Sequence, residues 1–194
     1  MAARDLDWHR RTHDFIVAAA LAVPVGVFWS FVYGYIWSFA SGAIPELGDV
    51  FDGFYVVGGV LVGYVIRKPG SGLLGEFLSS LVSLPFTGFG VVVLWLGVLQ
   101  GLGAEALLLG VRYRHLNWGV LAAAGAAGSL VATIGYYYPV EGWLQLAVGV
   151  QVLRIVLRLI GGAVLAGVAG KLIGDALAQT GVLNNFPIAR AREI

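Results

Sequence analysis

Long uncharged runs dominate this chain and limit what it can fold into. No Asp, Glu, Lys or Arg occurs in residues 15–45, 77–104 or 115–140. Charged residues make up 12% of the sequence and hydrophobic residues 59%, with a mean hydropathy of +0.86. A soluble domain normally carries about 25% charged residues, because its surface must stay hydrated. The pattern predicts an all-α integral membrane protein, with lipid as its main solvent.

The apolar stretches predict a single domain, residues 1–194, built as a bundle of six transmembrane helices. The expected spans are residues 15–39, 51–66, 72–84, 90–111, 118–138 and 143–173. Most of them approach the roughly 20 residues that are needed to cross about 30 Å of hydrocarbon. The third is short, because about 13 residues that rise ~1.5 Å each cover only ~20 Å. The alternation typical of a β-barrel is missing, which favours helices.

The positive charges orient the bundle. One side of the six-span arrangement holds Arg4, Arg10, Arg11, Arg67, Lys68, Arg112, Arg114, Lys171, Arg190 and Arg192. The opposite loops hold Glu46, Asp49, Asp52 and Glu141, and no Lys or Arg. By the positive-inside rule, both termini are expected in the cytoplasm, as an N-terminal segment (residues 1–14) and a tail (residues 178–194). The apolar run that follows the first segment is too long for a signal-peptide core, so it is expected to be a retained span.

Several classes of function find no support in the sequence. There is no cysteine, which excludes disulfides, thiolate metal sites and cysteine nucleophiles. The net charge is +1 without a basic block, so a nucleic-acid partner is not expected. The three histidines, His9, His13 and His115, lie at the expected cytoplasmic edges. No catalytic residue, metal site or cofactor is predicted.

Five polar side chains are expected inside the membrane: Glu76, Gln100, Glu105, Arg154 and Arg158. Ionisable residues at such depth indicate a functional site by default, because their desolvation must be offset by a partner or by water. A structural ion pair, or an acid that reaches the interface, is the alternative for Glu76. The two arginines lie four apart on one helix face, where they would neutralise the two acids or contact a partner protein.

Aromatic residues form a stripe on the outer half of the first span, at Trp29, Tyr33 and Trp37. Such residues form either an interfacial belt or the wall of a pocket. Aromatic faces beside carboxylates suit a flat, cationic, partly apolar ligand. The residues expected to bind substrate are Glu76, Gln100, Tyr33, Trp37, Tyr55, Trp95, Glu105 and Tyr137.

Small residues form a second stripe on the first span, at Ala18, Ala22 and Gly26. Small residues at intervals of four let two helix backbones approach closely in a membrane. The stripe therefore indicates either packing within the bundle or contact with a partner protein. Pro24 lies in the same span and favours a kink there.

Three motifs together resemble a known family: "IRKPGSGLLGE" (66–76), "LQGLGAE" (99–105) and the Ala-x-x-x-Ala of the first span. They are similar to the thiamin/hydroxymethylpyrimidine-type substrate-binding membrane subunits, the S components, of energy-coupling-factor (ECF) ABC transporters. The similarity covers residues 15–188, including size and six-helix layout.

The resemblance implies a vitamin importer subunit in a prokaryotic cell membrane. It implies capture of thiamin or its hydroxymethylpyrimidine precursor from outside, and assembly with a transmembrane coupling protein and two cytoplasmic ATPases. The chain itself has no Walker sequence. In the family, the small residues of the first helix contact the coupling protein, which points to Ala18, Ala22 and Gly26 here. A membrane-embedded enzyme that uses Glu76 or Glu105, or a structural subunit, is the alternative.

The resemblance also raises a question of depth. Ligands of this family sit toward the extracellular half of the bundle, whereas counting along the helices places Glu76 and Glu105 nearer the cytoplasm. A recessed start of the short third span would bring Glu76 toward the midplane, as interrupted helices do in many transporters.

Overall fold

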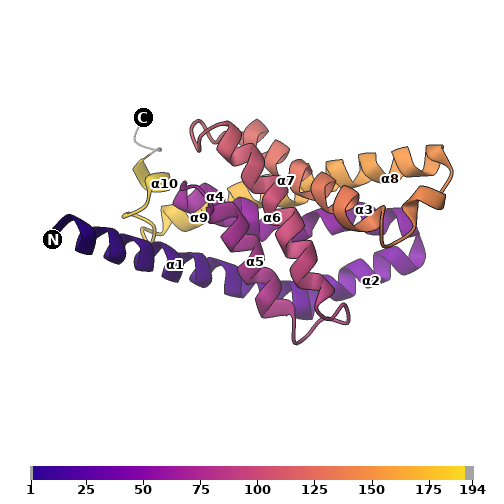
Figure 1. The fold of residues 1–194 in the computed structure, drawn as a ribbon, viewed down its shortest axis with the longest axis horizontal. Helices are drawn as coiled ribbons and strands as arrows, with labels where there is room; N and C mark the ends of the chain where they lie inside the picture. The colour runs from indigo at the N-terminus through magenta and orange to yellow at the C-terminus, as the bar shows by residue number, and fades with distance from the viewer. Residues whose placement is uncertain (1, 191–194) are drawn as a thin grey trace.

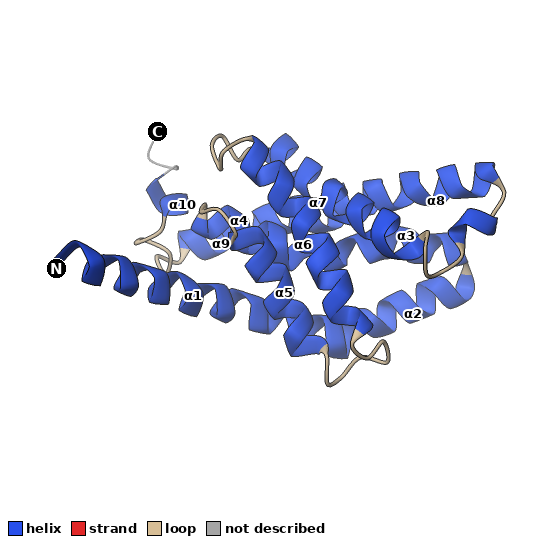
Figure 2. Ribbon diagram, viewed as in Figure 1, coloured by secondary structure: helices blue, strands red, loops and turns tan. Residues whose placement is uncertain are grey.

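The protein is all helix and loop in the part of the chain that the computed structural model describes, residues 2–190 (Figure 2). Side chains are described for residues 12–31 and 33–189. The last residues of the expected cytoplasmic tail lie outside the described range. The helices, with π- and 3₁₀-segments labelled η, are α1 (Ala2–Phe28), η1 (Trp29–Tyr33), α2 (Gly34–Ala43), α3 (Pro45–Asp52), η2 (Gly53–Val56), α4 (Val57–Ile66), α5 (Ser71–Ser83), α6 (Val92–Gly110), α7 (Trp118–Ala132), η3 (Thr133–Tyr137), η4 (Trp143–Gln145), α8 (Val148–Gly161), η5 (Gly162–Val168), α9 (Ala169–Gln179) and α10 (Pro187–Arg190).

Five helical stretches are long and apolar enough to cross a membrane. They are Thr12–Phe31, Pro45–Ile66, Val92–Gly110, Trp118–Tyr137 and Val148–Gln179. The third expected span corresponds to α5, which has 13 residues and falls short of the length needed by itself. The prediction of an all-α membrane protein is thus confirmed, with five spans long enough to cross.

Two long helical rods run along the bundle, and the other helices pack between them (Figure 1). One rod is α1, η1 and α2, which continues through Pro24 without a break. The other is α8, η5 and α9. Helix α4 is the centre of the packing, since all ten of its residues are buried and it contacts α1, α5, α6, α7 and α9. A helix that is apolar all round is expected to lie in the middle of a bundle.

Helix α1 packs against α5 through its small residues. Ala18 and Ala22 are fully buried, and the Ser79 hydroxyl donates a hydrogen bond to the Ala22 carbonyl (3.3 Å). A Cβ at Gly26 would lie 2.5 Å from the Ser79 carbonyl oxygen. In this arrangement a partner protein cannot reach the stripe. The geometry therefore corrects the expected coupling-protein contact to helix–helix packing within the bundle.

Glycines also allow the second rod to touch its neighbours at backbone distance. A Cβ on Gly125 of α7 would lie 2.0 Å from the Gly162 carbonyl oxygen, and one on Gly53 would lie 2.1 Å from backbone atoms of Gly161 and Gly162. Close backbone approach of this kind is the main source of helix association in lipid, where apolar side chains gain little from leaving it.

The start of α5 is held by an acid from a different helix. No side chain of α5 itself caps it, and Gly70 precedes it at φ +88°. Glu105 of α6 accepts the Gly70 N–H through Oε1 (2.7 Å), and the Gly72 (2.9 Å) and Leu73 (3.3 Å) N–H groups through Oε2. The Tyr113 hydroxyl donates a further bond to Oε2 (2.5 Å). Burial, followed by this bond, raises the pKa of Tyr113, so the hydroxyl keeps its proton.

Glu76 of α5 makes a similar but weaker contact with α4. Its Oε2 accepts the N–H of Gly59, in the first turn of α4, at 2.7 Å. The side chain is fully buried, and Oε1 has no hydrogen-bond partner among the described residues. Both acids thus bind backbone donors near a helix N-terminus, where a negative charge is also favoured by the helix dipole.

We expect the glycine contact between α7 and η5 to be sensitive to one added carbon. Gly125→Ala should lower the free energy of unfolding by about 1–3 kcal/mol, because overpacking forces backbone shifts. Gly149→Ala in α8 is the control, since its Cβ would meet nothing within 4 Å. Thermal unfolding in detergent measures both variants. Equal midpoints would contradict the close contact.

The two buried acids should respond differently to amidation. Glu105→Gln places an amide donor against backbone donors, and should cost about 1–3 kcal/mol, the range for an unsatisfied buried group. Glu76→Gln keeps a carbonyl for Gly59 and replaces only the unpartnered oxygen, so it should leave stability within about 1 kcal/mol. The comparison of thermal midpoints of the two variants tests this. A larger loss in Glu76→Gln would overturn the assignment.

Candidate functional site

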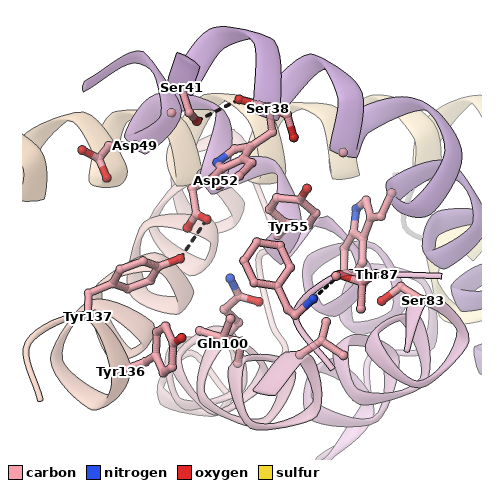
Figure 3. A pocket seen from close by; sticks show the side chains of 18 of the residues that line it. Ser38, Ser41, Asp49, Asp52, Tyr55, Ser83, Thr87, Gln100, Tyr136 and Tyr137 are labelled. Carbon is pink, nitrogen blue, oxygen red and sulfur yellow. Dashed lines mark hydrogen bonds between the residues drawn. The ribbon is translucent and has the colours of Figure 1, made fainter. Parts of the chain in front are cut away.

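A cavity of about 580 Å³ opens between α2, α3, η2, the α5–α6 loop, η3 and α8, at the end of the bundle away from the N-terminus. Figure 3 shows the side chains of Asp52, Tyr55, Gln100 and Tyr137 around one common space. Its volume lies within the range of roughly 300–1,000 Å³ that small-molecule sites occupy. This cavity is the candidate functional site.

Aromatic rings form much of the cavity wall. Trp37 of α2 meets Phe89 of the α5–α6 loop edge to face, with ring centroids 5.9 Å apart. Tyr55 of η2 is held against Trp29 in the same way, at 5.4 Å. The side-chain N–H groups of both tryptophans are buried without a partner among the described residues. The wall therefore offers ring faces together with unused hydrogen-bond donors.

An ion-pair network between α3 and α8 forms another wall. Arg154 donates to Asp49 through Nε (2.6 Å), and Arg158 donates to the other oxygen of Asp49 (3.0 Å). Arg158 also lies 3.0 Å from Oδ2 of Asp52. The Tyr137 hydroxyl donates to Oδ1 of Asp52 (3.1 Å). Because these charges are largely removed from water, each is tolerable only because it is paired.

Asp52 retains capacity to bind a further group. Its Oδ2 is in ion-pair contact with Arg158 but makes no hydrogen bond to any described residue. The Arg158 guanidinium in turn sits 3.4 Å from the centroid of the Tyr137 ring, which fixes it by a cation–π contact. Asp52 is thus a buried carboxylate whose position is set by two neighbours.

Amide and hydroxyl groups complete the lining. Gln100 of α6 is buried, yet its amide makes no hydrogen bond to another described residue, so both its donor and its acceptor remain available. Hydroxyl groups lie around it from α2, α5 and the α5–α6 loop: Ser38, Ser41, Ser80, Ser83 and Thr87. No group of three or more His, Cys, Asp or Glu suited to a metal ion occurs among the described residues.

Four of the eight residues predicted to bind substrate line this cavity: Trp37, Tyr55, Gln100 and Tyr137. Their contact with a ligand stays a prediction. Tyr33 lies behind the wall, where its hydroxyl donates to the Phe51 carbonyl (2.5 Å) and its ring stacks on Phe54. Trp95 is 52% exposed on the outside of α6.

Glu76 and Glu105 are not among the residues that line the cavity. Their carboxylates are turned toward the first turns of α4 and α5, as described above. The structure therefore corrects their predicted position in a substrate pocket. The two acids were placed there because they are buried charges, but a charge that binds backbone donors at a neighbouring helix start is also buried.

Two acids that sequence reasoning left in an outer loop, Asp49 and Asp52, belong to the cavity. Helix α3 begins at Pro45 and carries both carboxylates into the bundle. They are the partners of Arg154 and Arg158, which the sequence paired with Glu76 and Glu105 or with another protein. The signal was present, because Pro at the first helical position followed by an acid is typical of a helix start.

Comparison with known proteins supports one family. Residues 13–131 match the family model described as "ABC-type cobalt transport system, permease component". A Bacillus subtilis (strain 168) protein, YkoE, named provisionally as an HMP/thiamine permease, is 40% identical over 139 residues. That match covers 71% of this chain and 69% of YkoE.

A solved structure agrees. The crystal structure of an S component of an ECF transporter superposes with a TM-score of 0.87 at 30% identity, over 93% of this chain and 92% of that one. Both sequence and fold point the same way. The chain belongs to this family of transporter permease components as an ECF-type S component, and is a transporter subunit rather than an enzyme.

Proposed function

We propose that the cavity binds thiamin or its hydroxymethylpyrimidine precursor, captured from outside the cell. The name of the Bacillus subtilis relative supports this class of ligand. The observation that carries the proposal is the composition of the wall, with aromatic rings, an incompletely bonded carboxylate at Asp52 and a free amide at Gln100. The proposed ligand contacts are Trp37, Tyr55, Gln100 and Tyr137, with Asp52 added.

The chemistry of the ligand matches the wall. Thiamin has a thiazolium cation and an aminopyrimidine ring, two flat groups that gain from aromatic faces. A carboxylate in a dry cavity attracts the cation or accepts from the amino group, and both contacts strengthen as water is excluded. The Gln100 amide offers a donor and an acceptor to the polar edge of the pyrimidine.

The three acids of the lining outnumber its two arginines. Asp49 and Asp52 are offset by Arg154 and Arg158, and Glu141, bonded by the Tyr136 hydroxyl (2.9 Å), adds one more negative charge. A site with surplus negative charge favours a cationic ligand over an anionic one. The pocket thus selects by charge as well as by shape.

We further propose six membrane segments, with α5 as the short sixth one, and both termini in the cytoplasm of a prokaryotic cell. The basic residues Arg67, Lys68, Arg112, Arg114 and Lys171 support this orientation, which places the cavity toward the outside. Membership of the S-component family supports assembly with a transmembrane coupling protein and two ATPases.

Asp52→Asn should weaken thiamin binding about tenfold or more, equivalent to ~1.4 kcal/mol. The variant keeps the shape of the side chain and loses the charge, while Arg158 keeps its bond to Asp49. Isothermal titration calorimetry on purified protein in detergent measures the affinity. Glu46→Gln is the control, because Glu46 lies on the same helix and does not line the cavity, so its affinity should stay within about twofold. Unchanged affinity in a folded Asp52→Asn protein would contradict the assignment.

Cysteine labelling tests the orientation. Cysteine at Gly42, where a Cβ would meet nothing within 4 Å, should react with an impermeant reagent added to intact cells. Cysteine at the exposed Arg114 should react only after the membrane is opened. The native chain has no cysteine, so labelling reports the introduced residue alone. The reverse pattern would overturn the proposed orientation.

A further inference from the structure

A second cavity lies at the opposite end of the bundle and plays no part in the proposed substrate site. It has a volume of about 400 Å³ and lies between the end of α4, the α6–α7 loop, α9 and α10. Its lining consists of Tyr64, Arg67, His115, Leu116, Asn117, Lys171, Asp175 and Ile188.

The charges around this cavity leave a positive excess. Lys171 is paired with Asp175 (2.7 Å) and also donates to the Tyr64 hydroxyl (3.1 Å). Arg67 uses only its Nε, which donates to the Tyr64 carbonyl (3.2 Å), and its terminal nitrogens make no hydrogen bond to a described residue. Partial burial lowers the pKa of the Arg67 guanidinium, since the loss of water outweighs its interactions with Tyr64 and Asp175. The cation therefore lacks a full counter-charge within the described chain.

The backbone holds these cations in unusual positions. Four non-glycine residues in the described part of the chain have positive φ: Arg67, Arg112, Tyr113 and His115. All four lie in the two turns at this end of the bundle, and two of them line the cavity. Such conformations persist only where the surrounding structure enforces them, and they gather at binding sites.

The cavity lies where lipid headgroups are expected. Arg67 follows Ile66, the last residue of one membrane span, and Asn117 precedes Trp118, the first residue of another. Apolar surface adjoins it, since Trp118 is 47% exposed and Leu172, next to Lys171, is 55% exposed. The Lys171 ammonium sits 4.7 Å from the Trp118 ring centroid. Tryptophan beside lysine at a span end is typical of the membrane interface.

We propose that this second cavity binds the phosphate of an anionic phospholipid, with the phosphate against Arg67 and His115 and an acyl chain along Trp118 and Leu172. A basic pocket between helices at the cytoplasmic face fits such a headgroup. The terminal nitrogens of Arg67 suit two phosphate oxygens at once. The positive end of the α7 dipole, beside Asn117, adds to the attraction. A zwitterionic headgroup carries its own cation and gains less.

The test is native mass spectrometry of the full chain purified with phosphatidylglycerol or with phosphatidylcholine. Wild type should retain phosphatidylglycerol, and Arg67→Gln should retain about fivefold less, the effect of one basic residue near a lipid surface. His115→Gln, at an exposed position, should also reduce retention and serves if Arg67→Gln does not fold. Arg114→Gln removes a charge from the same loop but does not line the cavity, so it should retain wild-type levels.

Two results would overturn the proposal. An equal loss in Arg114→Gln would show diffuse electrostatic attraction instead of a site. Displacement of phosphatidylglycerol by inorganic phosphate, with phosphate alone raising the thermal midpoint, would assign the cavity to free phosphate. Thiamin affinity is measured on the same variants and should not change, which separates this site from the proposed substrate cavity.

Discussion

Backbone N–H groups at helix starts inside the bundle are the constraint on which this structure depends. A helix start has donors without intrahelical partners, and lipid offers no water to satisfy them. The protein supplies carboxylates from neighbouring helices, with Glu105 at the start of α5 and Glu76 at the first turn of α4. The same helix, α5, carries Ser80 and Ser83 into the cavity wall. The position of the pocket therefore depends on acids that do not belong to it.

Paired charges let the pocket wall be polar at low dielectric. Asp49 accepts from two arginines, and Arg158 divides its guanidinium between Asp49 and Asp52. Glycines bring α8 and η5 close to α3 and η2, so these side chains meet directly. Burying any one of the four charges alone would be strongly unfavourable, whereas the network leaves only one carboxylate oxygen without a hydrogen bond, on the ligand side of the proposal.

The sequence was sufficient for the class of protein and for half of the predicted site residues. Uncharged runs and the three motifs led to an all-α membrane protein and to the S-component family, both confirmed. Trp37, Tyr55, Gln100 and Tyr137 were found because aromatic and amide side chains near the outer half of a span have few roles besides a pocket or a belt.

The other predictions failed for physical reasons that one helix cannot reveal. Glu76 and Glu105 bind backbone donors of neighbouring helices, and a sequence pattern on their own helix contains no sign of those donors. Ala18 and Ala22 face α5, but a small-residue stripe looks the same whichever helix it meets. Asp49 and Asp52 were missed although Pro45 marked the start of their helix.

The π-helical segment η1 separates two tasks within one rod. Before it, α1 packs its small residues on α5, and after it, α2 presents Trp37 and Ser41 to the cavity. A π-turn holds one residue more than an α-turn, so it shifts the angular phase of everything that follows by about 100°. Loss of one residue there would turn the α2 face away from the cavity and leave the α1 contacts in register. In this fold, the length of a helix can change what the pocket recognises while every side chain in its wall stays the same.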